Sequence, residues 1–392
     1  MSEWNRVPLE TLLQTGVSYG IVQPGTAQEA GVPIIRVKDV RNGRIDTIDP
    51  LRVSPEIEAK HSRTRLRGGE VLLTLVGSTG QTAIASDRLA GWNVARAIGV
   101  MRPIPEVSPQ WLRYYLDSED AQQYILERLN TTVQATLNLK DVRVLPVPLP
   151  PRREREAITA VAGALDDRIA VNERIAATAE DLSMTLVISE SRRERVRLDE
   201  ICSLRKDQVA PQELADEAVD HYSLPAFDAG KLPERVSPES IKSGKFTVSK
   251  PAVLLSKLNP DIPRVWSVIP DSEVPSLAST EFLVLAPRGS LTVHELWAVT
   301  SQRSFLQSLA SKVTGTSKSH QRVRPAEVMA TEVVDPRQFG EAGQRIRNLA
   351  SRAALARQES QALAALRDTL LPQLMSGRLR VKDAEKIVGD RV

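Results

Sequence analysis

The first 150 residues alternate short apolar runs with turns rich in glycine and proline. β-Branched residues are concentrated in four of these runs, at 32–37, 71–76, 95–101 and 142–147. Pairs such as Asn42-Gly43 and Gly68-Gly69 favour tight turns between strands. The pattern predicts a compact domain of mixed but mostly β structure from about residue 16 to residue 150.

A long helix follows this domain. Between Ala157 and Ile188 there is no proline or capping glycine, and apolar residues recur mostly every three or four positions. They are Ile158, Val161, Leu165, Ile169, Ile175, Ala179, Leu182 and Leu186. Such a helix is roughly 45 Å long at 1.5 Å per residue. The prolines of the preceding run, 146–151, hold the residues before them in extended conformations, so this run predicts a stiff connector.

The second half repeats this plan. Strands are expected at 252–255, 265–269 and 282–285, helices near 291–312, and a second long helix at 339–371. Leu349, Ala356, Leu363 and Leu370 recur at a constant heptad interval in this helix, and its alanines let a partner helix approach closely. We therefore expect the two long helices to pair antiparallel, with Asn172 fixing their register. The alternative is that each helix packs only on its own domain.

The two halves of the chain resemble each other in order and spacing. The stretch from Val71 to Val187 recurs in outline from Val253 to Leu371, displaced by close to half of the chain length. Each copy begins with an apolar strand, Val71–Leu75 or Val253–Lys257, and ends in a long helix. A duplicated unit places two similar surfaces in fixed relation. The natural target of such a pair is a partner with its own linear repeat, and DNA is the leading candidate.

The amino-acid composition limits which cellular compartment and which kinds of functional site are expected. With 392 residues, 41% of them hydrophobic, the chain should form two or three packed domains. The single cysteine, Cys202, excludes an internal disulfide, and the four histidines are too scattered for a metal site. Because no signal segment and no apolar run of about 18 residues occurs, we expect a cytoplasmic protein without a membrane span. The net charge of +3 and pI near 9.0 favour polyanionic partners only weakly.

Two helical segments carry a family resemblance. Leu149–Ile158 with Ala164–Ile169, and Leu366–Gly377, resemble the central and distal conserved regions of specificity subunits of Type I restriction-modification systems. Arg155-Glu156 departs from the Glu-Gln pair common in the family. Both halves also resemble the target-recognition domains of these subunits. The motifs are Gly77-Ser78-Thr79-Gly80 with Asn93-Val94-Ala95-Arg96 in the first half, and Leu224-Pro225-Ala226-Phe227-Asp228, Ser256-Lys257-Leu258-Asn259-Pro260 and Ile262-Pro263-Arg264-Val265-Trp266 in the second.

This resemblance implies an α+β fold with an internal pseudo-two-fold repeat. Two mixed α/β target-recognition domains would be separated by two long helices that pair as an antiparallel coiled coil. The expected divisions are target-recognition domain 1 at 1–150, the central long helix at 151–190, target-recognition domain 2 at 191–336, and the distal long helix with the C-terminal tail at 337–392.

The resemblance also implies a non-catalytic subunit. Each recognition domain would read one half of a bipartite site in double-stranded DNA, and the helices would set the spacer between the halves. Two modification subunits would dock on the chain and methylate adenine with S-adenosylmethionine. Restriction subunits, which use ATP and Mg, would bind through them. No cofactor is expected in this chain.

Three catalytic motifs that bear on this expectation are incomplete. Asn259-Pro260-Asp261-Ile262 lacks the second proline and the aromatic residue of an amino-methyltransferase turn, and Gly77–Thr82 lacks the lysine and spacing of a phosphate-binding loop. Glu58-Ala59-Lys60 has no Pro-Asp upstream, as it would in a metal-dependent nuclease. We therefore expect no catalytic residue. The alternative function is a coiled-coil scaffold of another DNA-defence complex, without sequence readout.

Candidate DNA contacts are polar and basic residues on turns and loops. Backbone amides of the turn Gly77-Ser78-Thr79-Gly80 could bind a phosphate, although a plain hairpin turn is the alternative. Loop side chains suit base and phosphate contacts, and a solvated surface is their alternative. In the first half they are Thr131, Thr132 and Gln134, with Arg36, Lys38, Asn93 and Arg96 as secondary candidates. In the second half they are Lys257, Asn259, Arg264, Lys312, Thr314, Thr316, Ser317, Lys318, His320 and Arg322. Tyr19 and Trp92 are interpreted as packing residues.

Overall fold

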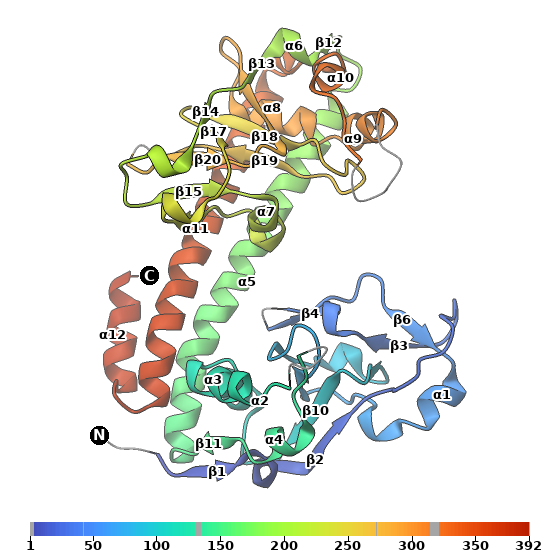
Figure 1. Cartoon of the computed structure of the whole chain (residues 1–392), viewed down its shortest axis with the longest axis vertical. Coiled ribbons are helices and arrows are strands. Elements are labelled where there is room, and N and C mark those ends of the chain that lie inside the picture. The colour runs from blue at the N-terminus through green and yellow to red at the C-terminus, as the bar shows by residue number, and fades with distance from the viewer. Residues whose placement is uncertain (1–3, 42, 131–134, 272, 314–320, 392) are drawn as a thin grey trace. The chain divides into compact units, whose positions relative to one another are not determined.

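The computed structural model describes residues 4–41, 43–130, 135–271, 273–313 and 321–391. The chain divides into two compact units. Unit 1 consists of Met1–Ala170 with Ser360–Val392, and unit 2 of Val171–Glu359. Each unit contains a β-rich part and about half of each long helix (Figure 1). The predicted α+β fold, with mixed sheets and two long helices, is confirmed.

A four-stranded antiparallel sheet forms the centre of unit 1, in the order β2-β10-β7-β8. Its strands are β2 (Leu13–Tyr19), β7 (Val71–Thr74), β8 (Thr82–Ile84) and β10 (Ile98–Pro103). All four residues of the central strand β7 are buried. Val71 and Leu73 join one hydrophobic cluster with α2 (Pro109–Leu116), whereas Leu72 joins a second cluster with Val100. The alternation follows from the two-residue period of a strand, and it explains why this strand is apolar throughout.

Smaller elements surround this sheet. A second sheet has the order β6-β3-β9, with β3 and β9 parallel. Its strands are β3 (Val32–Ile35), β6 (Leu51–Val53) and β9 (Asn93–Val94). The other elements are β1 (Arg6–Pro8), the pair β4 (Val40–Arg41) and β5 (Arg44–Ile45), α1 (Pro55–Ala59), the 3-10 helix η3 (Ser62–Thr64), α3 (Glu119–Glu127), α4 (Leu139–Arg143) and β11 (Pro146–Pro148).

Unit 2 repeats the central sheet with the strand order β13-β21-β18-β19. The strands are β13 (Cys202–Arg205), β18 (Ala252–Ser256), β19 (Val265–Val268) and β21 (Phe282–Pro287). The first turns of α2 and of α8 (Val293–Thr300) are capped by hydroxyls, because Ser108 and Thr292 each accept a hydrogen bond from the backbone amide three positions ahead. These caps occupy matching positions of the two halves, so the internal repeat predicted from the sequence is confirmed in detail.

A five-stranded sheet, β14-β17-β20-β15-β16, packs beside the central sheet within unit 2. Its strands are β14 (Gln208–Val209), β15 (Val219–Tyr222), β16 (Glu234–Val236), β17 (Lys245–Thr247) and β20 (Ser276–Ala278). The parallel pair β15 and β20 matches the pair β3 and β9 of unit 1. The remaining elements are β12 (Arg195–Arg197), α6 (Leu198–Ile201), α7 (Leu224–Gly230), α9 (Arg303–Ala310), α10 (Pro325–Met329) and β22 (Glu332–Val334).

The long helices are α5 (Arg152–Ser189) and α11 (Glu341–Met375), and they pair within each unit. In unit 1, Arg367 Nη1 of α11 lies 2.5 Å from Asp166 Oδ1 of α5. In unit 2, Arg357 Nη2 lies 2.7 Å from Glu180 Oε1. Partners later in α5 are earlier in α11, so the predicted antiparallel pairing is confirmed. Asn172 is buried, and its Nδ2 has no hydrogen-bond partner among the described residues; its predicted role in fixing the register stays a prediction.

One local prediction was wrong. The strand expected at 142–147 begins as the helix α4 and continues as β11. The proline-rich connector is extended, as predicted, and its residues Pro146–Pro148 also pair with β1 as an antiparallel strand. Arg155, which departs from the family pattern, is buried and donates to the carbonyls of Pro150 and Glu106, so it holds the start of α5. The C-terminal tail contains α12 (Val381–Arg391), which lies beside α11 and buries Ala384 in the core of unit 1 (Figure 1).

Within the described ranges, no helix is both long and apolar enough to cross a membrane. No cluster of three or more His, Cys, Asp or Glu side chains suited to a metal ion was found in the same ranges.

Candidate nucleic-acid interface

The two segments predicted to contact DNA in each half meet in the structure. In unit 1, Val76, just after β7, forms a β-bridge with Thr136. In unit 2, Leu258, just after β18, forms one with Arg322. The two bridges occupy matching positions of the repeat. We call this meeting point of a strand end and a later loop the strand-end junction, and it occurs in both units.

The glycine-rich turn between β7 and β8 is a hairpin connection. The amides of Gly77, Thr79 and Gly80 donate to backbone carbonyls at 3.2, 2.8 and 3.0 Å. Gly77 and Gly80 adopt φ angles of +80° and +90°, which glycine tolerates without strain. Because these three amides are engaged within the protein, they are not available to a phosphate, and that prediction is corrected. The exposed side chain of Ser78 stays a candidate contact.

Asn93 is a structural residue rather than a DNA contact. It is fully buried, and its side-chain amide donates to Glu58 Oε1 at 3.0 Å and to the carbonyl of His61 at 3.1 Å. Its Oδ1 accepts from Thr64 Oγ1 at 2.8 Å. A hydrogen bond from Arg65 holds the pKa of the Glu58 carboxyl below its ordinary value, so this buried carboxylate is ionised. The network fixes the segment that follows α1.

The other secondary candidates of unit 1 differ in availability. Arg36 donates through Nε to Asp39 at 2.8 Å and through Nη2 to the carbonyl of Asp49 at 2.6 Å, and its side chain is only 25% exposed. Its charge is therefore largely neutralised inside the protein. Lys38 and Arg96 are exposed and remain candidates.

Two arginines of unit 2 are neutralised in the same way. Arg264 forms a bidentate pair with Asp228, with both N–O distances at 2.7 Å, and is 12% exposed. Arg322 binds Glu281 at 2.9 and 3.1 Å and lowers the pKa of that carboxyl. A guanidinium held by a carboxylate offers little net charge to a phosphate. These arginines hold the junction together more than they present charge.

The remaining described candidates of unit 2 are partly structural. Asn259 has a left-handed φ of +47°, and its Oδ1 is buried without a hydrogen-bond partner among the described residues. Lys312 donates through Nζ to Thr331 Oγ1 at 2.8 Å. Lys257 is half-buried at the end of β18, directly at the strand-end junction. It is therefore the best-placed candidate cation of this group.

Eight predicted contacts fall outside the described residues. They are Thr131, Thr132, Gln134, Thr314, Thr316, Ser317, Lys318 and His320. They stay predictions.

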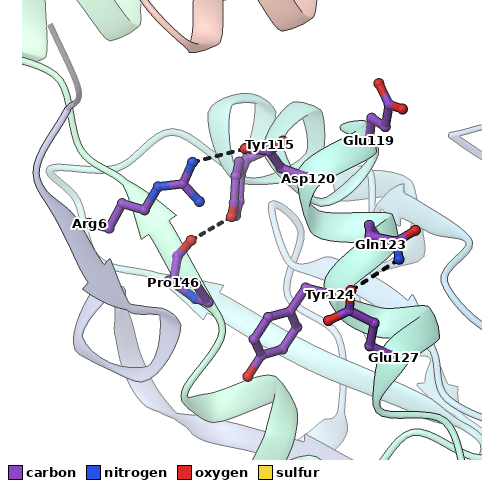
Figure 2. Close-up of a pocket in the computed structure, with 8 residues that line it drawn as sticks. All are labelled: Arg6, Tyr115, Glu119, Asp120, Gln123, Tyr124, Glu127 and Pro146. Atoms are coloured by element: carbon purple, nitrogen blue, oxygen red, sulfur yellow. Dashed lines mark hydrogen bonds and ion pairs between the residues drawn. The ribbon is translucent and has the colours of Figure 1, made fainter.

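A pocket of unit 1, drawn in Figure 2, has an acidic lining that would repel DNA. Its volume is about 470 Å³. Glu119, Asp120 and Glu127 line it from α3, and Arg6 Nη2 pairs with Asp120 Oδ2 at 2.9 Å. The buried Tyr115 hydroxyl donates to the carbonyl of Pro146, and burial raises its pKa to about 12. Three carboxylates against one guanidinium repel a phosphate, so we place no DNA contact here.

A second concave surface of unit 1 has the opposite charge. It measures about 310 Å³ and is lined by Gly16, Val17, Ser18, Tyr19, Lys60, His61, Arg63, Thr64, Leu139 and Arg143. We call it the basic pocket. Its residues come from β2, the segment after α1, and α4, so no single stretch of the sequence could predict this pocket. Tyr19, predicted to be a packing residue, is 48% exposed at this pocket, and that prediction is wrong.

The comparison with known proteins agrees with this architecture. Residues 1–181 match the family described as Type I restriction modification DNA specificity domain. The family resemblance inferred from the sequence motifs is confirmed for this region, which spans the β-rich part of unit 1 and most of α5.

Three individual proteins are similar to part or all of this chain. The chain is 31% identical over 159 residues to the Type I restriction enzyme EcoBI specificity subunit of Escherichia coli, and the alignment covers 40% of this chain but only 33% of that protein. The S subunit of a Type I restriction-modification system from M. genitalium has a similar fold, with a TM-score of 0.50 and 14% identity over 95% of this chain and 96% of that one. For the HsdS subunit from Thermoanaerobacter tengcongensis the TM-score is 0.37, with 18% identity over 96% and 98% of the two chains.

Proposed function

We propose that this chain is the DNA-specificity subunit of a Type I restriction-modification complex. The observation that carries the proposal is the strand-end junction, which recurs at the same place in two sheets of the same strand order. Two equivalent junctions on one chain suit a bipartite duplex site, with one unit reading each half. The specificity domain in residues 1–181 supports this assignment for unit 1, and the repeat extends it to unit 2.

The chemistry belongs to other subunits in this proposal. Two modification subunits dock on the chain and methylate adenine with S-adenosylmethionine, and restriction subunits that use ATP and Mg bind through them. The complex acts on DNA in the cytoplasm. The chain itself is not an enzyme, since its nearest approaches to methyltransferase and phosphate-loop motifs are incomplete.

The test is to express the chain with its modification subunit and to map methylated adenines by single-molecule sequencing. We expect one bipartite motif with two defined half-sites and a constant gap. The chain alone should methylate nothing. Methylation in every sequence context alike would support the scaffold alternative, and methylation by the isolated chain would overturn the assignment of chemistry to the partners.

A pair of variants tests the division of labour. Lys257→Gln removes a cation at the strand-end junction of unit 2, and Lys250→Gln removes an exposed cation just before the other end of β18. We expect Lys257→Gln to weaken or relax one half-site while sparing the other, and Lys250→Gln to leave the motif unchanged. Equal weakening of both half-sites would contradict the assignment of one half-site to each unit.

A further inference from the structure

We propose that the basic pocket of unit 1 binds a phosphate of the DNA backbone. The proposal rests on the proposed function and adds a contact that anchors unit 1 to the duplex whatever its base sequence. Three exposed cations, Lys60, Arg63 and Arg143, line the pocket, and no carboxylate lines it. The pocket therefore concentrates positive charge on a concave surface, where a phosphate can contact several donors at once.

The charges of this pocket are available. The side chains of Lys60, Arg63 and Arg143 form no hydrogen bond or ion pair within the part of the chain that the structure describes. By contrast, Arg36 and Arg264 are held by carboxylates 2.7 to 2.8 Å away. A phosphate approaching a paired guanidinium must compete with a carboxylate, whereas one approaching the basic pocket meets unopposed charge.

The backbone under these side chains is already in place. Arg102 donates to the carbonyls of Arg63 and Arg65, both at 2.7 Å, and is itself held by Glu70 at 3.2 Å. The buried Asn93 donates to the carbonyl of His61. Two separate anchors thus fix the segment between α1 and β7. Little backbone conformational entropy remains to be lost when a ligand binds to a segment held in this way.

The lining chemistry favours a phosphate over a base. The pocket contains no asparagine or glutamine, the side chains that read adenine by paired hydrogen bonds. It offers cations together with the hydroxyls of Ser18 and Tyr19, which suit phosphate oxygens. The predicted contact is therefore independent of base sequence.

The experiment measures the DNA affinity of the complete complex with its modification subunit. One duplex contains the bipartite motif found by methylation mapping and the other lacks it, and the salt concentration is varied from about 50 to 200 mM. Lys60→Gln, Arg63→Gln and Arg143→Gln should each weaken both duplexes by the same factor, roughly three- to fivefold. Each should also lower the slope of log affinity against log salt by about 0.9, and the triple variant by close to three times that amount.

Arg88→Gln is the matched control. Arg88 is exposed on the 3-10 helix Asp87–Leu89, outside the pocket, and this change removes the same charge. We expect it to leave the salt slope unchanged. Thermal unfolding should be unaffected in all four single variants, because exposed side chains without partners contribute little to stability.

Several results would overturn the pocket proposal while leaving the proposed function intact. They are pocket variants that behave like Arg88→Gln, variants that change the preferred half-site sequence, and variants that impair assembly with the modification subunit but not DNA affinity. Failure of the proposed function would look different, because the wild-type complex would then show no preference for any motif.

Discussion

Units 1 and 2 share a scaffold but present different surfaces on it. Their central sheets have the same strand order, and α3 and α9 start at matching positions of the repeat. Glu119 and Asp120 at the start of α3 correspond to Arg303 and Ser304 at the start of α9. The acidic pocket of Figure 2 therefore has no acidic counterpart at these two positions of unit 2. Buried strands maintain the fold while exposed helix faces diverge, as the proposed reading of two different half-sites requires.

The difference extends into the interior. Asn93 of β9 pairs with Ile34, and Leu277 of β20, its counterpart in unit 2, pairs with His221 in the matching parallel pair. Asn93 and Leu277 are both buried. In unit 1 the Asn93 side chain holds the segment after α1 that contains Lys60 and Arg63, which we call the basic segment. In unit 2 the Leu277 side chain only fills the core. On the exposed side, Arg143 of the basic pocket corresponds to Met329. The phosphate contact proposed for unit 1 is therefore not repeated at this position.

The largest expected effect contrasts the two halves of the helix pair. In unit 1 the seam contains buried leucines such as Leu363, and in unit 2 it contains alanines such as Ala356. Leu363→Ala should cost about 2–5 kcal/mol through the cavity it leaves, and Ala356→Leu about 1–3 kcal/mol through overpacking. Chemical denaturation measures both. The control Leu355→Ala, at a residue 57% exposed, should change stability by less than about 0.5 kcal/mol. A tolerated Ala356→Leu would mean that the seam of unit 2 is not tightly packed.

The next effect concerns the buried asparagine. Asn93→Leu, which imitates unit 2, should cost about 1–3 kcal/mol because Glu58 and the carbonyl of His61 each lose a buried donor. It should also weaken DNA binding through the loosened basic segment. Asn5→Leu, at an exposed position, is the control and should leave stability nearly unchanged. If Asn93→Leu is as stable as the wild type, the network does not hold this segment.

A smaller effect is the pH dependence of unit 2. Burial lowers the pKa of His221 and of His294 below the ordinary value of 6.5. A histidine with a depressed folded pKa contributes stability that is complete above the unfolded pKa and is lost as pH falls through the folded value. The thermal stability of the protein should therefore decrease as the pH is lowered from 7 to about 5. His221→Leu and His294→Leu should each flatten this dependence, and an unchanged slope in both variants would contradict the assignment.

The smallest expected effect is a longer gap between the two DNA half-sites, without loss of DNA binding. α5 and α11 each continue through both units, so four residues inserted after Ala176 and four after Ala356 should lengthen the pair by about 6 Å and nearly preserve the apolar face. This corresponds to between one and two base pairs at about 3.4 Å each. Mapped methylation sites should keep both half-sites and show a longer gap. New half-site bases with the old gap would show that the helices do not set the spacer.

Local sequence patterns predicted the regular elements well. The helix expected at 157–188 is part of α5, and the strands expected at 252–255 and 282–285 are β18 and β21 within two residues. Apolar periodicity is a local property, so it can be read directly. The run 142–147 was predicted wrongly as a strand because five residues of α4 are too few to establish a helical period. The site was predicted less well, since Asn93 is buried and Tyr19 is exposed.

The amino-acid sequence by itself determined the duplication, the two apolar sheets and the paired helices, because these depend on the order and period of apolar residues along the chain. The tertiary structure alone decided which cations are free. Arg264 is neutralised by Asp228, 36 residues away, and Arg322 by Glu281, 41 residues away. The basic pocket likewise joins β2, the segment after α1, and α4. Electrostatic pairing acts over a few ångströms in space whatever the separation in sequence, so only the folded chain shows which positive charges are neutralised and which are not.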